Sequence, residues 1–444
     1  MIALDCDYCI STKENNMKIL PLLLSAFLLC ACNATATTQS TPPPIDEASL
    51  QPYTNNTQGF SKARLKNIDV VMQKYIAANK LVGTLSLVAR NGEIVHLSAN
   101  GLRDKENNLP MKEDTIFRIY SMTKPITAVA AMTLWEQGKF QMNDPITKYL
   151  PELSNLKVYV SGKGADMVLE DAKSPIRVID LFMHTAGFSY GFTGSELDNL
   201  YRNSPIGLGK ASPDTVLHEL AKLPLNHQPG TKWHYGVNTD VIGFMVERIT
   251  GMKLGEYMQQ VVFDPLNMKD TGFAVMPQNI HRFAEVYGPN DEGKTVLNTD
   301  EPLGDFLSDP AIHNGGGGLT STIRDYYKFA QMLLNKGVYK GKRILGRKTV
   351  EYLTSNHLPP ELIPFAAGAP GEGYGLAMSV TVDQNQVLFM SSTGNYGWGG
   401  AASTYFRIDP KENMIMMSFA QFLPMGYHPY HDEFRNVVYQ ALVD

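Results

Sequence analysis

One helix that is apolar on every side constrains the fold of this chain more than any other stretch. Between Pro125 and Trp135 the only polar residues are Thr127 and Thr133. A helix on the surface of a globular protein shows a polar face, so this helix is expected to be buried nearly all round. The chain has 444 residues, of which 43% are hydrophobic, and this is enough for the sizeable core that such a helix needs.

A serine and a lysine stand at the start of this helix. Residues 115–118 are expected to be extended, and Ser121 lies at or just inside the helix N-terminus, with Pro125 near the first turn. Lys124 follows Ser121 by three residues and therefore shares its face of the helix. An N-cap serine beside a solvated lysine is the alternative, but a lysine at the mouth of a buried helix favours catalysis. The pair is a candidate nucleophile and base.

Composition narrows the class of protein. The net charge is −5 and no basic stripe is visible, so nucleic acid is not an expected partner. The ten histidines show no spacing typical of metal ligands, and we expect neither a metal nor a cofactor. All four cysteines lie within the first 32 residues, so the body of the protein has no disulfide and is held by packing alone.

The N-terminal residues predict export. Met17, an alternative start, opens a charged segment before an apolar run at 19–29, which is too short to span a bilayer but typical of a signal peptide. The run ends in Leu-Cys-Ala-Cys, which resembles a bacterial lipoprotein cleavage site with Cys32 as the lipid-bearing residue; a plain cleaved signal is the alternative. We expect a signal peptide over 1–31, a flexible tether over 32–58, and a periplasmic protein or a lipoprotein that meets the membrane only through Cys32.

Residues 59–444 are predicted to form an α+β domain. Helices and loops dominate between residues 121 and 317. Strands are expected on both sides of that region, at 81–89, 94–99, 377–382, 387–391, 402–408 and 414–421. Strands at both ends imply one antiparallel sheet, flanked by helices, with an inserted, mostly helical lobe. The sheet lobe would comprise 59–120 and 318–444, and the helical lobe 121–317.

Two further stretches contain residues suited to chemistry. Tyr235 stands in a loop, residues 230–240, that leads into a helix; taken alone, it is more simply explained by core packing. Residues 394–402 open a strand and are rich in glycine. Glycines in a strand let a ligand or another backbone approach closely, and a backbone N–H at the strand edge can hold an oxyanion.

Together these stretches resemble the serine β-lactamase and penicillin-binding protein superfamily, and within it the family VIII carboxylesterases. The resemblance extends from Phe60 to the C-terminus and follows the family's order of motifs. The matching motifs are Ser121-Met122-Thr123-Lys124, Leu181–Gly187, Trp233-His234-Tyr235, the glycine run before Leu319-Thr320-Ser321-Thr322, and Gly397-Trp398-Gly399-Gly400. The resemblance implies a β-lactamase-like fold and a cofactor-free hydrolase that forms an acyl-serine intermediate.

The resemblance also implies residue roles. Ser121 would be the nucleophile, and Lys124 and Tyr235 its catalytic partners. The backbone N–H groups of Ser121 and Ala401 would form the oxyanion hole. The substrate-binding residues would be Trp398, Gly399 and Gly400. Whether Lys124 or Tyr235 is the general base stays open, because strongly coupled groups titrate as a pair.

Two departures from true β-lactamases favour esters as substrates. Lactamases of this type carry Tyr-x-Asn, whereas Val237 stands here at the third position and Asn238 comes one residue late. They also carry Lys-Thr-Gly on the strand, and this chain has Trp398-Gly399-Gly400 instead. The missing lysine would hold the carboxylate of a β-lactam. We therefore expect small-molecule esters of small to medium acyl chains.

Three other readings compete with this one. Ser189 lies in a G-x-S-x-G match, the nucleophile-elbow pattern of α/β-hydrolases, but neither a buried strand nor a long helix is expected around it. A β-lactamase or D-Ala-D-Ala peptidase of the same superfamily would act on amide bonds. A catalytically silent binding protein would retain only the fold, although Ser121, Lys124 and Tyr235 are all present.

Overall fold

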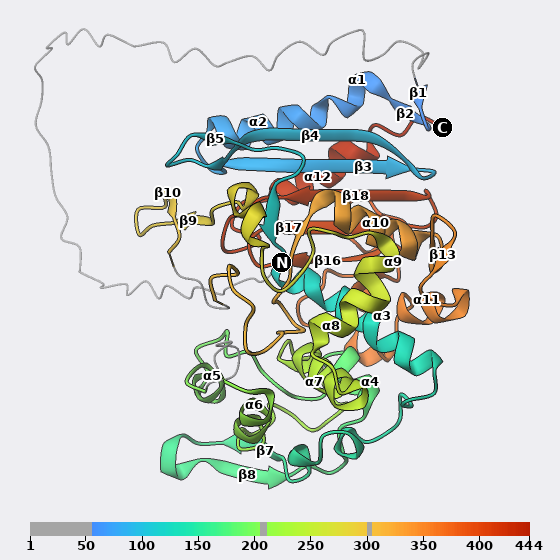
Figure 1. Cartoon of the computed structure of the whole chain (residues 1–444). Coiled ribbons are helices and arrows are strands. Elements are labelled where there is room, and N and C mark those ends of the chain that lie inside the picture. The colour runs from blue at the N-terminus through green and yellow to red at the C-terminus, as the bar shows by residue number, and fades with distance from the viewer. Residues whose placement is uncertain (1–55, 205–210, 300–303) are drawn as a thin grey trace, which may run out of the picture. The chain divides into compact units, whose positions relative to one another are not determined.

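An eight-stranded antiparallel sheet is the centre of the computed structural model, which describes residues 56–204, 211–299 and 304–444 (Figure 1). The predicted signal peptide, and the tether as far as residue 55, lie outside the described residues. In spatial order the strands are β14 (Glu372–Tyr374), β15 (Ser379–Thr381), β16 (Tyr396–Gly400), β17 (Thr404–Asp409), β18 (Met414–Phe419), β3 (Gly83–Arg90), β4 (Glu93–Asp104) and β5 (Leu109–Pro110).

The two ends of the described chain meet in this sheet, as the sequence predicts. Strand β18 pairs with β3, with Met417 opposite Leu87, and Figure 1 shows the two strands side by side. The turn between β3 and β4 contains Asn91 (φ 55°) and Gly92 (φ 83°), the two positive φ angles that a type I′ hairpin turn requires. The α+β class with an antiparallel sheet is thus confirmed.

Side chains alternate between the two faces of the sheet, and each face packs on its own core. Leu87 and Met417 belong to the larger core, which extends into the helical part of the molecule. Val88 and Met416 point to the other face, where α2 (Asn67–Ala77) and α12 (Tyr430–Tyr439) cover the sheet. The sheet is therefore buried on both sides.

One predicted strand is wrong. Residues 387–391 form a loop in which Leu388 is 87% exposed, and the strand of this region is β16 instead. Apolar residues in 387–391 suggest a strand, yet no neighbouring strand pairs with them. Strand β16 is rich in glycine because it needs close approach: a Cβ on Gly400 would lie 2.3 Å from the carbonyl oxygen of Ile119.

The part of the chain between the two sets of sheet strands is mostly helical. Its helices and those that flank the sheet are α1 (Lys62–Leu65), α3 (Thr123–Glu136), α4 (Val178–Phe182), α5 (Glu196–Arg202), α6 (Pro213–Leu220), α7 (Asn238–Thr250), α8 (Leu254–Met258), α9 (Asp264–Leu266), α10 (Ile323–Leu334) and α11 (Arg347–Leu353). Short strand pairs also occur: β1 (Asn56–Thr57) with β2 (Phe60–Ser61), β7 (Lys157–Ser161) with β8 (Val168–Asp171), β9 (Tyr287–Pro289) with β10 (Thr295–Leu297), β12 (Val338–Tyr339) with β13 (Lys342–Arg343), and β6 (Ile116–Arg118) with β11 (Thr320–Thr322).

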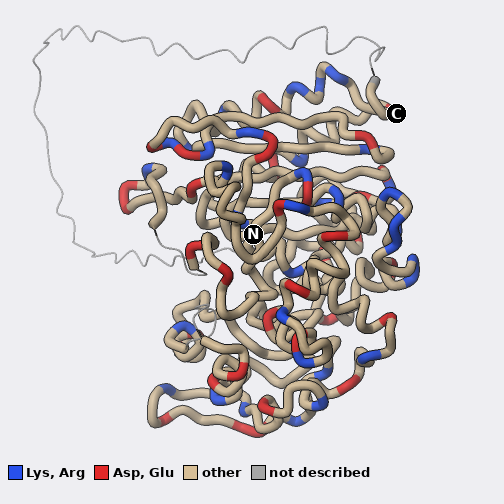
Figure 2. Tube along the Cα trace, in the orientation of Figure 1, with Lys and Arg blue, Asp and Glu red and all other residues tan. Residues whose placement is uncertain are grey.

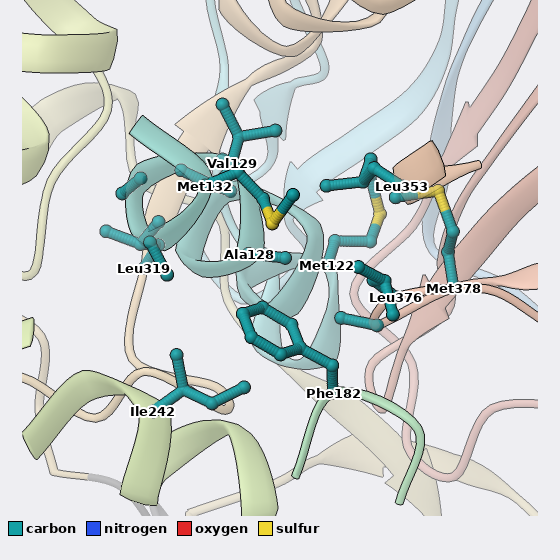
Figure 3. Packing of buried hydrophobic residues seen from close by; sticks show 14 of the residues in the cluster. Met122, Ala128, Val129, Met132, Phe182, Ile242, Leu319, Leu353, Leu376 and Met378 are labelled. Carbon is teal, nitrogen blue, oxygen red and sulfur yellow. The ribbon is translucent and has the colours of Figure 1, made fainter. Parts of the chain in front are cut away.

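Helix α3 is buried on every side, as its composition predicts. Every residue from Thr123 to Leu134 is buried. Figure 3 shows side chains from α4, α7 and the segments around Leu319, Leu353 and Leu376 packed around it. The elements that surround α3 are the same ones that bring the motif residues together.

Charged residues of both signs are spread over the sheet and helical parts of the molecule (Figure 2). Within the described ranges, no helix combines the length and hydropathy needed to cross a bilayer.

Replacing Gly400 with alanine tests the contact between β16 and the start of α3. The new Cβ would lie 2.3 Å from both the Ile119 carbonyl oxygen and the Thr404 hydroxyl oxygen, so strand and turn must separate. Such overpacking costs about 1–3 kcal/mol, measured by urea unfolding. Gly194→Ala is the control, because its Cβ meets no atom within 4 Å. Equal stability of the two variants would contradict the contact.

Candidate active site

Ser121 lies in a single 3₁₀ turn, Tyr120–Met122, that leads directly into α3. The preceding residue, Tyr120, has φ 41°, a left-handed conformation that a bulky residue adopts at a cost of about 1–3 kcal/mol. The turn is held from both sides: Ile119 N–H donates to the Leu319 carbonyl (3.0 Å), and Tyr120 packs edge-on against Phe306. Ser121 is partly exposed between two buried neighbours, so its hydroxyl is accessible in a fixed position.

Lys124 is buried, with 1% of its surface exposed, and its amine is aimed at the serine. Nζ donates to Ser121 Oγ at 3.3 Å and to the carbonyl oxygen of Gly316 at 2.6 Å. Nζ also lies 4.6 Å from the ring centre of Tyr235 and 5.0 Å from that of Tyr190, distances typical of cation–π contacts. The lysine is thus a hydrogen-bonded partner of the serine and not a solvated surface residue.

Tyr235 stands in the loop before α7 and completes this group. Its hydroxyl accepts a hydrogen bond from the indole Nε1 of Trp398, on β16, at 3.3 Å. Its ring stacks on Trp233 with a 5.8 Å separation of ring centres. Motifs from α3, from the loop before α7 and from β16 therefore meet at one place, as the sequence predicts.

Gly400 lets β16 lie directly against the turn that carries Ser121. A Cβ on Gly400 would clash with Ile119, and one on Gly399 would clash with Met425. Ala401 follows Gly400 directly and is exposed. The end of β16 and the Ser121 turn are consequently neighbours, which is the arrangement that two backbone donors to one oxyanion require.

Asn238 does not face the serine. It is fully buried, and its side-chain Nδ2 donates to Nδ1 of His184 at 2.9 Å. The backbone N–H of Gly236 points to the same nitrogen at 3.4 Å, so Nδ1 is the acceptor and Nε2 carries the proton. Burial lowers the pKa of His184 well below its usual value, and the imidazole is neutral. Asn238 and His184 therefore fix the loop that carries Tyr235.

Two site neighbours, Asp240 and Tyr190, are absent from the sequence prediction. Asp240, in the first turn of α7, accepts hydrogen bonds from the Gly316 N–H (2.8 Å) and from the Tyr190 hydroxyl (2.9 Å). Burial raises its pKa, and the nearby charge of Lys124 opposes that rise. The sequence did contain a sign of Asp240: it is the single acidic residue within the apolar run of α7. A buried carboxylate needs hydrogen-bonding partners, so such a residue indicates a polar site.

Ser189 does not form a nucleophile elbow. It lies in a loop after α4, is 1% exposed, and has no strand before it. Its hydroxyl donates to the carboxylate of Asp198 and accepts from the Gly191 N–H, while His234 Nε2 lies 3.2 Å away. In a catalytic triad the carboxylate binds the histidine, whereas here it holds the serine proton itself. Ser189 is thus a structural link within its loop.

Comparisons with known proteins agree with this fold. The beta-lactamase family model matches residues 68–440. Protein Rv1367c of Mycobacterium tuberculosis is 36% identical over 355 residues, which cover 78% of this chain and 87% of the relative. Esterase EstB of Burkholderia gladioli is 36% identical over 244 residues, covering 54% of this chain and 58% of EstB.

Solved structures show the same fold. EstCE1, described as a hydrolase with promiscuous acyltransferase activity, superposes with a TM-score of 0.73 at 24% identity, over 85% of this chain and 99% of EstCE1. The family model covers most of the chain, and the matched residues include Ser121, Lys124 and Tyr235. The chain belongs to the beta-lactamase family of serine hydrolases, which has esterases among its members.

Proposed function

We propose that this protein is a serine carboxylesterase that cleaves small-molecule esters of small to medium acyl chains through an acyl-serine intermediate. The observation that carries the proposal is the hydrogen bond between Lys124 Nζ and Ser121 Oγ, with the Tyr235 ring 4.6 Å from the same amine. A serine hydroxyl next to a buried amine loses its proton more readily than one in water.

In the proposed reaction, Ser121 Oγ attacks the ester carbonyl as its proton passes to the Lys124–Tyr235 pair. The backbone N–H groups of Ser121 and Ala401 stabilise the oxyanion, an effect worth about 3–4 kcal/mol per donor in other hydrolases. The C–O bond then breaks, and the alkoxide leaves as the alcohol after protonation through Tyr235. Water, deprotonated by the same pair, hydrolyses the acyl-serine and regenerates Ser121.

Two features support an ester over a β-lactam. Trp398, Gly399 and Gly400 occupy the strand where lactamases carry Lys-Thr-Gly, so this strand offers no ammonium to a substrate carboxylate. Asn238 is committed to His184 and is not directed to the substrate. An ester needs neither anchor.

The nucleophile is tested with two serine variants. Ser121→Ala is expected to lower hydrolysis of a short-chain p-nitrophenyl ester by about three orders of magnitude or more. Ser189→Ala is the matched control and is expected to keep most of the activity. It should lose about 1–3 kcal/mol of stability, because the Asp198 carboxylate loses a buried donor.

Three results would contradict this proposal in different ways. Loss of activity in Ser189→Ala alone would transfer the nucleophile to that serine. Turnover of a chromogenic cephalosporin at a rate that rivals the ester would favour the lactamase or peptidase reading. A wild-type protein that neither hydrolyses esters nor is labelled by a fluorophosphonate would be a silent binding protein.

Lys124→Ala is expected to abolish acylation, because Ser121 Oγ loses the only amine within hydrogen-bonding distance among the described residues. The measurement is the pre-steady-state burst of p-nitrophenol, which reports the acylation step. Lys148→Ala is the control, since that exposed lysine pairs with Asp144 instead. A near-normal burst in Lys124→Ala would reject the role of the lysine.

We also propose that the protein is exported and anchored by a lipid on Cys32. Cys32→Ala should then move the protein from the membrane fraction to the soluble fraction of the cell envelope and leave its activity unchanged. Cys30→Ala is the matched control and should stay with the membrane. If Cys32→Ala remains membrane-bound, the anchor lies elsewhere.

A further inference from the structure

The carboxylate of Asp240 is buried among groups that also contact the Lys124 amine. It is 5% exposed and accepts one hydrogen bond on each oxygen, from the Gly316 N–H at 2.8 Å and from the Tyr190 hydroxyl at 2.9 Å. A buried carboxylate without partners costs several kcal/mol, so these two bonds fix its position. None of the motifs in the sequence assigns it a role.

Both partners of Asp240 also contact Lys124. The carbonyl oxygen of Gly316 accepts from Nζ at 2.6 Å, and the ring of Tyr190 lies 5.0 Å from Nζ. Gly316, Asp240 and Tyr190 are closely packed. A Cβ on Gly316 would lie 2.4 Å from Asp240 Oδ2 and 2.3 Å from the Tyr190 hydroxyl. The carboxylate thus holds two of the groups that orient the amine toward Ser121.

Asp240 and Lys124 also interact through their charges. Burial raises the pKa of Asp240, and the charge of Lys124 opposes that rise by favouring the ionised carboxylate. Among the described residues, Tyr190, Tyr235 and His184 are titratable groups close to this pair. Burial keeps His184 neutral and raises the pKa of Tyr190 well above its usual value, so neither supplies a counter-charge to the amine.

We propose that Asp240 is a positioning residue for acylation. It fixes Lys124 Nζ against Ser121 Oγ through Gly316 and Tyr190, and its negative charge stabilises the ammonium that Lys124 becomes when it takes the serine proton. No bond of Asp240 forms or breaks. A carboxylate that orients a base and stabilises its protonated form acts as the aspartate of a serine–histidine triad does. This inference rests on the proposed function of Ser121 and Lys124.

Asp240→Asn is the variant that tests the charge, because the amide keeps the shape and one acceptor oxygen. We expect kcat/KM for a p-nitrophenyl ester to fall about tenfold or more, with the loss in kcat and little change in KM. The pre-steady-state burst of p-nitrophenol should slow by the same factor, because the loss falls on the acylation step.

Asp325→Asn is a matched control. Asp325 is also a buried aspartate in the first turn of a helix, α10, where it accepts from the Asp270 N–H and pairs with Lys328. It has no contact with the Lys124 amine among the described residues. This variant is expected to lose stability but to keep the wild-type kcat and burst rate, which separates a structural loss from an effect on the lysine.

A wild-type kcat and burst rate in Asp240→Asn would overturn the inference. If that variant does not fold, Tyr190→Phe gives the second test, since it removes one donor to Asp240 and keeps the ring near Nζ; an unchanged kcat there would also overturn it. The rate of Ser121 labelling by a fluorophosphonate distinguishes a failure of the proposed function from a failure of the role proposed for Asp240. Wild-type protein that is not labelled refutes the proposed function, whereas slowed labelling in Asp240→Asn supports the role of the carboxylate.

Discussion

The arrangement of the site depends on one buried amine that must stay hydrogen-bonded. Lys124 is almost completely removed from water, and an amine in that position is tolerated only where acceptors replace the lost water. Ser121 Oγ and the Gly316 carbonyl are those acceptors. For Gly316 to reach the amine, the glycine run must pass very close to α3, and Thr127 Oγ1 secures it by donating to the Gly315 carbonyl at 2.7 Å. One of the two threonines in the apolar helix is thereby explained.

Another side of the site is built by the separate β6–β11 strand pair and by β16 of the eight-stranded sheet. Strand β11, which follows the glycine run, pairs with β6, which precedes Ser121, so the two segments are tied together by backbone hydrogen bonds. Strand β16 is pressed against the same turn through Gly400 and brings Trp398 to the Tyr235 hydroxyl. Because β3 and β18 pair at the centre of the sheet, residues from both ends of the domain are needed to build this side of the site.

The sequence predicted the parts of the fold and site that depend on local pattern. Three such patterns each lie within a few residues, and the structure has them as predicted: the apolar run of α3, the Asn91-Gly92 turn and the serine–lysine spacing. Prediction was wrong at 387–391, where apolar residues lack a pairing partner, while the glycine-rich β16 is a full strand. Glycines lower the β-propensity of a segment, so the sequence of β16 does not predict a strand. Gly400 is needed because the strand passes close to the carbonyl of Ile119, and this tertiary contact cannot be read from the local sequence.

The tertiary contacts also explain why Asp240 and Tyr190 were missed. Each residue is ordinary in its own segment, and only the meeting of α7, the loop after α4 and the glycine run reveals what they do.

The shifted asparagine is consistent with the other departures from a lactamase. The asparagine stands at position 238 and not at 237, so its side chain is buried and hydrogen-bonded to His184. There it supports the loop that carries Tyr235. With the strand lysine replaced by Trp398, the wall of the site becomes aromatic: Trp398 lies edge-on to Tyr374, and Phe192, 66% exposed, stacks on Tyr190. Aromatic side chains bind apolar groups of a substrate by burying them, and they offer no positive charge to a substrate carboxylate. The absence of an anchoring cation and the aromatic surface thus both support the proposed preference for a neutral ester.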